Sequence, residues 1–226
     1  MDDFIYVKRN GIPREQCNEI IDLFEQSGNK IPGTIGGKSD RIDEELKKCT
    51  EEFIMYGNNN NYDSIFISYL NNALGEYKSK YPHVNRIDRW QLFTQYKVQK
   101  YNPNEGCFAL HCENCGSEFL QGIAAGRMLV WMIYLNDVTE GGYTVWPQQE
   151  RVLAPKCGDI VIWPPYWTHP HQGITSKTQT KYILTGWYNY VEYSPEEQEK
   201  ILKESAEMEA KGEKQYEEWL AKITDG

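Results

Sequence analysis

The sequence predicts an α+β protein that is mainly β, with a sandwich or jelly-roll core between N-terminal helices and a C-terminal helix. Three observations support this class. Residues 1–89 carry apolar residues at helical spacing, residues 90–190 contain short apolar segments separated by turn signals, and residues 191–226 are rich in Glu and Lys. Because 226 residues suffice for one substantial core, we expect a single domain with these three parts.

Two helices are predicted before residue 90. The first covers about residues 12–27, with Pro13 near its start and Gly28 just past its end. Its apolar positions are Ile20, Ile21, Leu23 and Phe24. The second begins near Asp63 and ends before Pro82, and its apolar residues also recur at helical spacing. Both helices are amphipathic, so we expect them to pack on one face of the sheet.

The central part is predicted to consist of strands. Turn signals such as Asn102-Pro103-Asn104 and Gly141-Gly142 separate the apolar segments. The predicted strands are Trp90 to Tyr101, Cys107 to Glu113, Arg127 to Leu135, Tyr143 to Trp146, Asp159 to Trp163 and Lys181 to Tyr190. Many short strands with regular turns are typical of a sandwich or jelly roll.

The C-terminal part is predicted to be one charged helix. Ser194-Pro195-Glu196-Glu197 is a capping box with proline at the first helical position. The helix should continue to about residue 222. Its Glu and Lys residues indicate a solvated face, with Leu202, Met208, Tyr216 and Trp219 as candidate contacts.

The composition restricts the partners and the compartment. A formal net charge of -9 disfavours nucleic acid, because Lys and Arg supply the attraction to phosphate. The chain has no apolar run long enough to span a membrane and no leader-like N-terminus, so we expect a cytoplasmic protein with no membrane partner. Six cysteines are too sparse for a disulfide scaffold, and reduced thiols are expected.

A candidate metal site is formed by His111 and Glu113 together with a histidine from the segment 167–173. On a strand, His111 and Glu113 share a face, so both can bind one ion. His169 and His171 compete for the third ligand, and the ten-residue spacing from His171 to Lys181 favours His171. Two imidazoles and one carboxylate on one face of an ion leave other positions open, as in non-haem Fe(II) oxygenases.

Lys181 follows His171 by ten residues and could return to the same cavity. A buried lysine without an acidic partner is costly, which indicates an anionic ligand if Lys181 points inward. A solvent-facing strand lysine is the alternative. Cys112 and Cys115 have the spacing of a zinc or redox pair, but no second cysteine pair follows, so we interpret them as incidental thiols.

Several segments occur in an order that is similar to a known family. They are Lys100-Tyr101-Asn102-Pro103, His111-Cys112-Glu113, Arg127 at a strand start, Glu140-Gly141-Gly142-Tyr143-Thr144, Pro155-Lys156-Cys157-Gly158-Asp159, His171-Gln172-Gly173, Lys181 and Trp187. Over residues 90–190 the chain resembles the 2-oxoglutarate- and Fe(II)-dependent dioxygenases, in particular their prolyl 4-hydroxylase branch. The resemblance implies a double-stranded β-helix (jelly roll) for residues 90–190.

The resemblance also implies the roles of individual residues. His111, Glu113 and His171 would hold Fe(II), and Lys181 would bind the distal carboxylate of 2-oxoglutarate. Tyr101 and Thr144 would place hydroxyl groups near the same carboxylate. The chain departs from the family in having Glu113 where aspartate is usual.

The implied reaction is hydroxylation of an unactivated carbon, most simply in a peptidyl proline, with O2 and 2-oxoglutarate as co-substrates and ascorbate as reductant. Succinate and CO2 would be released. The implied partner is a proline-containing peptide or protein, or a small molecule. Residues 32–40 and 114–126 are candidate lids. The alternative is a cupin-like jelly roll that binds metal without oxygenase activity.

Overall fold

The computed structural model describes residues 2–35, 42–57, 60–114 and 124–224. The chain forms two compact units, Met1–Tyr190 and Val191–Gly226. This boundary coincides with the predicted start of the C-terminal extension, while the single-domain organisation stays a prediction. None of the helices in the described ranges combines the length and apolar character that crossing a membrane requires.

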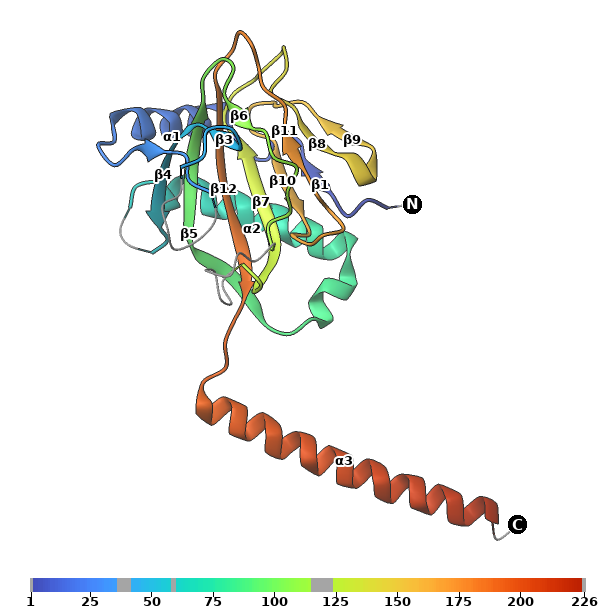
Figure 1. Ribbon diagram of the computed structural model, residues 1–226. Coiled ribbons are helices and arrows are strands. Elements are labelled where there is room, and N and C mark those ends of the chain that lie inside the picture. Colours follow the sequence, from blue (N-terminus) through green and yellow to red (C-terminus); the bar gives the residue numbers. More distant parts are fainter. Residues whose placement is uncertain (1, 36–41, 58–59, 115–123, 225–226) are drawn as a thin grey trace. The chain divides into compact units, whose positions relative to one another are not determined.

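The first unit is built on a seven-stranded sheet with the order β1-β10-β7-β12-β5-β4-β2 (Figure 1). Its strands are β1 (Tyr6–Lys8), β2 (Ile31–Pro32), β4 (Thr50–Met55), β5 (Trp90–Tyr101), β7 (Arg127–Tyr134), β10 (Ile160–Trp163) and β12 (Lys181–Tyr190). All neighbouring strands in this sheet are antiparallel.

The remaining strands form two smaller sheets. A three-stranded sheet has the order β11-β8-β9, with β8 (Thr144–Trp146), β9 (Arg151–Leu153) and β11 (Gln172–Gly173). The second is a pair of short strands, β3 (Lys47–Lys48) and β6 (Gly106–Cys107). Two short 3-10 helices, η1 (Pro82–Arg86) and η2 (Pro147–Gln149), follow α2 and β8.

One face of the large sheet is covered by helices α1 (Arg14–Gln26) and α2 (Asp63–Lys80), as predicted (Figure 1). Phe24 of α1 and Phe66 of α2 are fully buried in this layer. Phe66 stacks on Trp131 of β7, with ring centroids 5.3 Å apart. The burial of large apolar side chains between helices and sheet is the main stabilisation of this half of the fold.

The other face of the large sheet packs against the three-stranded sheet. Trp146 of β8 and Leu153 of β9 share a buried cluster with Val130 of β7, Trp163 of β10 and Ile183 of β12. Two sheets with a common apolar interior are the predicted sandwich architecture. The candidate site lies on this inner face.

The second unit is the helix α3 (Pro195–Thr224). Its capping box is formed as predicted: Ser194 N donates to Glu197 Oε2 over 2.8 Å, and Glu197 N donates to Ser194 Oγ over 3.2 Å. Leu202, Met208 and Tyr216 are exposed, and the side chain of Trp219 lies outside the described part.

The predicted strand Cys107 to Glu113 is wrong. Only Cys107 of this segment belongs to a strand, and His111 forms an isolated β-bridge with His171. After the bridge the chain turns, so that Glu113 N donates to Pro165 O. β4 was missed, because Glu51 and Glu52 within it are charged but buried.

Candidate metal centre

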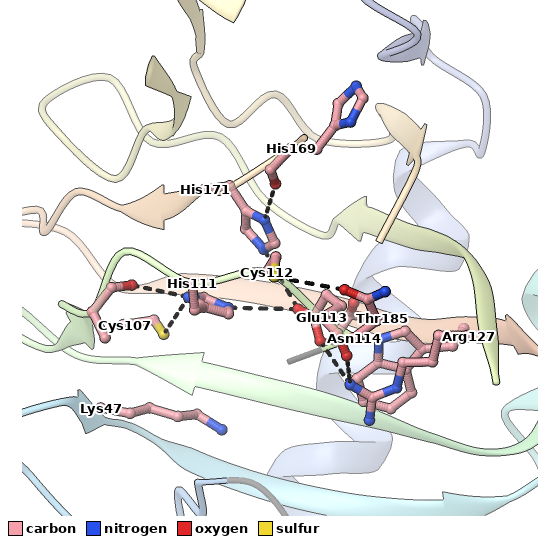
Figure 2. A network of polar contacts seen from close by, with 12 residues as sticks. Lys47, Cys107, His111, Cys112, Glu113, Asn114, Arg127, His169, His171 and Thr185 are labelled. Carbon is pink, nitrogen blue, oxygen red and sulfur yellow. Dashed lines mark hydrogen bonds and ion pairs between the residues drawn. The ribbon is translucent and has the colours of Figure 1, made fainter. Parts of the chain in front are cut away.

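The side chains of His111, Glu113 and His171 converge on one point on the inner face (Figure 2). Their ligand atoms all lie within 4.8 Å of one another. Nε2 of His111 is 3.5 Å from Oε1 of Glu113, and Nε2 of His171 is 3.4 Å from the same oxygen. Neighbouring ligands on an ion with bonds of about 2.1 Å lie roughly 3 Å apart, so small adjustments suffice to close these atoms on a cation.

Backbone carbonyls orient both imidazoles. Nδ1 of His111 lies 2.9 Å from Ala109 O, and Nδ1 of His171 lies 3.2 Å from His169 O. When Nδ1–H donates to a carbonyl, Nε2 is the nitrogen left to bind a metal. The reciprocal bonds between His111 and His171 main chains, 3.0 and 2.8 Å long, hold the two rings at a fixed separation. These contacts fix the orientation and the separation of both imidazoles.

Glu113 is fixed by two groups on the side opposite the histidines. Its Oε2 accepts a hydrogen bond of 3.0 Å from Trp187 Nε1 and one of 3.1 Å from Arg127 Nη1. The Arg127 guanidinium also stacks on the Trp187 ring, with Cζ 3.8 Å from the ring centroid. One carboxylate oxygen is thus held by the protein while the other faces the imidazoles. This support fixes the orientation of the Glu113 side chain.

The pKa values of Glu113 and His111 are shifted in opposite directions by their contact. Burial alone raises the pKa of Glu113, but hydrogen bonds from His111 and His171 outweigh it and hold this pKa well below its ordinary range. Burial lowers the pKa of His111, yet contacts with Cys107 and Glu113 raise it overall to about 11. A cation that binds Nε2 of His111 therefore has to displace a proton.

His171, and not His169, completes the cluster. The His169 ring points away from Glu113 (Figure 2), with Nε2 3.0 Å from Asp3 O and Nδ1 2.8 Å from Thr168 Oγ1. His169 contributes instead through its carbonyl oxygen, which contacts Nδ1 of His171. The ring orientations thus agree with the preference for His171 that the spacing to Lys181 gave.

Lys181 points inward, as the anionic-ligand interpretation required. Its side chain is buried, and Nζ donates a hydrogen bond of 2.9 Å to Gly142 O. The same Nζ lies 5.4 Å from the Tyr101 ring centroid and 5.8 Å from that of Tyr134. Burial lowers the pKa of Lys181 to about 8. Because the side chain is buried, the solvent-facing alternative is wrong. Among the described residues, no carboxylate forms an ion pair with this ammonium group.

The two predicted hydroxyl residues line the same region. Tyr101 lies opposite Lys181 in the β5–β12 register, and its hydroxyl donates to Gln99 Oε1 over 3.0 Å. Thr144 is buried, and its Oγ1 accepts a hydrogen bond of 2.7 Å from Tyr134. The rings of Tyr101 and Tyr134 lie beside Lys181, while the hydroxyls of Tyr101 and Thr144 bond to other side chains. Their role toward a carboxylate stays a prediction.

Several residues of the site were missed by the sequence reasoning. Trp163 and Trp146 pack around His171, with ring centroids 5.2 and 6.2 Å away. Tyr134 carries the hydroxyl that positions Thr144. These aromatic residues lie in apolar strand segments, where their spacing signals only a core. Cys115 and most of the candidate lids fall on residues 36–41 and 115–123, outside the described part.

Residues 96–189 match the family described as the 2OG-Fe(II) oxygenase superfamily. A protein of Acanthamoeba polyphaga mimivirus named "Putative prolyl 4-hydroxylase" is 28% identical. That match covers 43% of this chain and 46% of the relative, so the chain aligns with about half the length of this curated protein.

Solved structures of prolyl hydroxylases have a similar fold. The viral collagen prolyl hydroxylase of Paramecium Bursaria Chlorella virus-1, solved with 2OG, has a TM-score of 0.60 at 17% identity and covers 84% of this chain and 97% of its own. A Pseudomonas putida prolyl-4-hydroxylase has a TM-score of 0.59 at 14% identity, covering 83% and 92%. A Trichoplax adhaerens prolyl hydroxylase was solved with a hypoxia inducible factor peptide. It has a TM-score of 0.60 at 17% identity and covers 83% of this chain and 84% of its own. These similarities confirm the double-stranded β-helix core.

Proposed function

We propose that this chain, a prolyl 4-hydroxylase-like member of the 2-oxoglutarate- and Fe(II)-dependent oxygenase superfamily, hydroxylates an unactivated carbon of a peptidyl proline. The observation that carries the proposal is the cluster of His111, Glu113 and His171 on the same inner face as the buried Lys181. Cys107 connects the two regions, because it contacts His111 and lies close enough to Lys181 to affect its pKa.

The donor set fits Fe(II). Two imidazoles and one carboxylate leave positions for co-substrates, and His111, Glu113 and His171 would hold the ion. Bound Fe(II) supplies the activation of O2 by which a C–H bond becomes C–OH while 2-oxoglutarate is converted to succinate and CO2. Arg127 and Trp187 keep Glu113 oriented with one oxygen toward the ion.

The buried charge of Lys181 supports a binding site for the co-substrate. Its ammonium group would bind the distal carboxylate of 2-oxoglutarate, which replaces a lone carbonyl contact by a charge-assisted pair. Tyr101 and the Tyr134–Thr144 pair lie beside it and would complete the polar lining. The indoles of Trp146 and Trp163 border His171 and keep water from that side of the centre. We include ascorbate as the reductant that returns the iron to Fe(II).

The test is succinate formation from 2-oxoglutarate with anaerobically loaded Fe(II), followed by addition of O2. We expect His111→Ala, His171→Ala and Lys181→Ala each to lose most of the activity of the natural chain. His83→Ala is the matched control, because His83 is an exposed histidine outside the cluster. Full activity in His111→Ala or His171→Ala would contradict the metal assignment.

Peptide arrays then test the substrate. Arrays with proline, lysine or asparagine at the centre should give hydroxylation, a mass increase of one oxygen atom, on the proline series. Hydroxylation of another series would keep the oxygenase and replace the substrate. Metal binding without any succinate would favour the cupin-like alternative.

A further inference from the structure

A second group of buried charges joins the inner face of the large sheet to the short strand β3, apart from the metal cluster and Lys181. Lys47 of β3, Glu51 of β4 and Lys97 of β5 have side chains that are 8%, 0% and 12% exposed. Lys97 and Tyr101 alternate on the same face of β5, and Tyr101 pairs with Lys181. Lys97 therefore faces the interior that contains the proposed active site.

The group has more positive than negative charge. Oε2 of Glu51 accepts from Lys47 Nζ at 2.5 Å and from Gln99 Nε2 at 2.8 Å, and it lies 3.3 Å from Lys97 Nζ. Oε1 of Glu51 accepts from both N and Oγ1 of Thr34 at 2.8 Å. The Glu51 carboxylate thus contacts two ammonium groups and accepts hydrogen bonds from three further donors. Within this group of three residues, positive charge exceeds negative charge by one, and a buried charge is unfavourable unless an anion lies near it.

Lys97 is the ammonium directed toward the metal centre. Its Nζ lies 5.8 Å from the ring centroid of Trp187, whose indole donates to Glu113, and 5.2 Å from that of Phe53. Burial and the neighbouring Lys47 lower the pKa of Lys97, although Glu51 and Glu113 act in the opposite direction. Lys97 is thus a partly compensated cation beside the Trp187 side of the centre.

Lys97 and Lys181 occupy different levels of the sheet and contact different groups, Glu51 and Gly142 O respectively. Lys97 of β5 pairs with Thr185 of β12, and Lys181 is the first residue of β12, four residues before Thr185. Four residues of strand extend roughly 13 Å. If Lys181 binds the co-substrate, Lys97 is left for another anionic group that enters from the Trp187 side.

We propose that Lys97 selects a substrate carrying a carboxylate near the carbon that is hydroxylated. This inference rests on the proposed function and specifies its substrate class. The carboxylate comes either from an Asp or Glu side chain beside the target residue of a peptide, or from a free carboxylic acid in a small substrate. Glu51 holds Lys97 in place without neutralising the whole group, so an incoming carboxylate completes the charge balance.

Equilibrium binding tests this inference without turnover. The full chain is loaded with Mn(II) and 2-oxoglutarate, and fluorescence anisotropy measures its affinity for proline-centred peptides with Asp or Glu, or with Asn or Gln, at each flanking position. A second arm compares N-acetylproline with its amide as competitors, which separates a free carboxylate from an acidic side chain. We expect one arm to show an acidic preference of roughly 10- to 100-fold in the natural chain, the range of a charge-assisted bond.

Three variants assign the preference. Lys97→Met should reduce it to less than about threefold, while Lys97→Arg should retain most of it. Lys100→Met is the matched control, since Lys100 lies on the opposite face of β5 with Glu25 and should leave the preference intact. Lys97→Met leaves a neutral pair of Lys47 and Glu51, so it should remain folded with an unchanged or higher unfolding midpoint.

Equal affinity for acidic and neutral ligands in the natural chain overturns the inference, as does a preference that survives Lys97→Met. Succinate formation by the Fe(II)-loaded chain without peptide reports the proposed function separately. Succinate together with no acidic preference rejects only the role of Lys97, whereas no succinate under any condition rejects the oxygenase itself.

Discussion

Replacing Lys181 by methionine should stabilise the fold while it removes the proposed carboxylate anchor. Burial lowers the pKa of Lys181 from its ordinary value of 10.5 to about 8. At about 1.4 kcal/mol for each unit, the protonated side chain costs the folded state roughly 3 kcal/mol. Methionine keeps the aliphatic length without the charge, but it leaves Gly142 O without its donor, which costs about 1 kcal/mol. A net gain of about 2 kcal/mol follows.

The pH dependence of this gain identifies its cause. Because the pKa of Lys181 is lower in the folded chain, the unfolded chain binds more protons between about pH 8 and 10.5. The natural chain therefore gains stability as pH rises through this window, and the advantage of Lys181→Met shrinks. Above pH 10.5 both states are deprotonated at this position, and the charge penalty vanishes.

Denaturant unfolding followed by tryptophan fluorescence measures the difference between the two chains at each pH. Lys100→Met is the control, since its ammonium is partly exposed and paired with Glu25. Calorimetry on the Mn(II)-loaded chains should show that Lys181→Met binds 2-oxoglutarate roughly 10- to 100-fold more weakly. A variant that is less stable at neutral pH, or a difference that stays constant through the window, would refute the reasoning.

Three further outcomes follow from the geometry. Trp187→Phe removes the indole donor to Glu113 and should weaken Mn(II) binding about 10-fold or more, as measured by calorimetry. An unchanged affinity would mean that this hydrogen bond does not orient the carboxylate. His169→Ala should retain Mn(II) affinity within a few-fold, because its imidazole contacts Asp3 O and not the cluster; complete loss would reinstate it as a ligand. Gly186→Ala should lower the unfolding free energy by about 1–3 kcal/mol, because an added Cβ would lie 2.6 Å from the Trp131 ring. If the variant is as stable as the natural chain in denaturant unfolding, the ring can shift freely.

The strands that pair over long distances were predictable because their sequence patterns are strong. Trp90–Tyr101 and Lys181–Tyr190 have the predicted bounds. The segment leading to Glu113 was not predictable in detail, because a single β-bridge with His171 replaces a strand. His111 and Glu113 still meet at one site, but a turn brings them together rather than the alternation of a strand.

The ligand types could be predicted from the sequence, whereas their supporting contacts could not. His111, Glu113 and His171 are polar residues in otherwise apolar or turn-rich surroundings, which makes them conspicuous. Spacing to Lys181 favoured His171 over His169, but the carbonyl contacts that orient the two rings are not encoded in that spacing. The buried group around Glu51 was missed for a related reason, since an isolated Glu or Lys in a strand is usually solvated.

The most direct test of the proposed centre is anomalous X-ray diffraction at the iron edge, using crystals grown anaerobically with Fe(II) and 2-oxoglutarate. We expect one iron peak about 2 Å from Nε2 of His111, Nε2 of His171 and Oε1 of Glu113, with the distal carboxylate of 2-oxoglutarate on Nζ of Lys181. An iron peak bonded to His169 or to the cysteines, or a co-substrate that does not contact Lys181, would contradict this account.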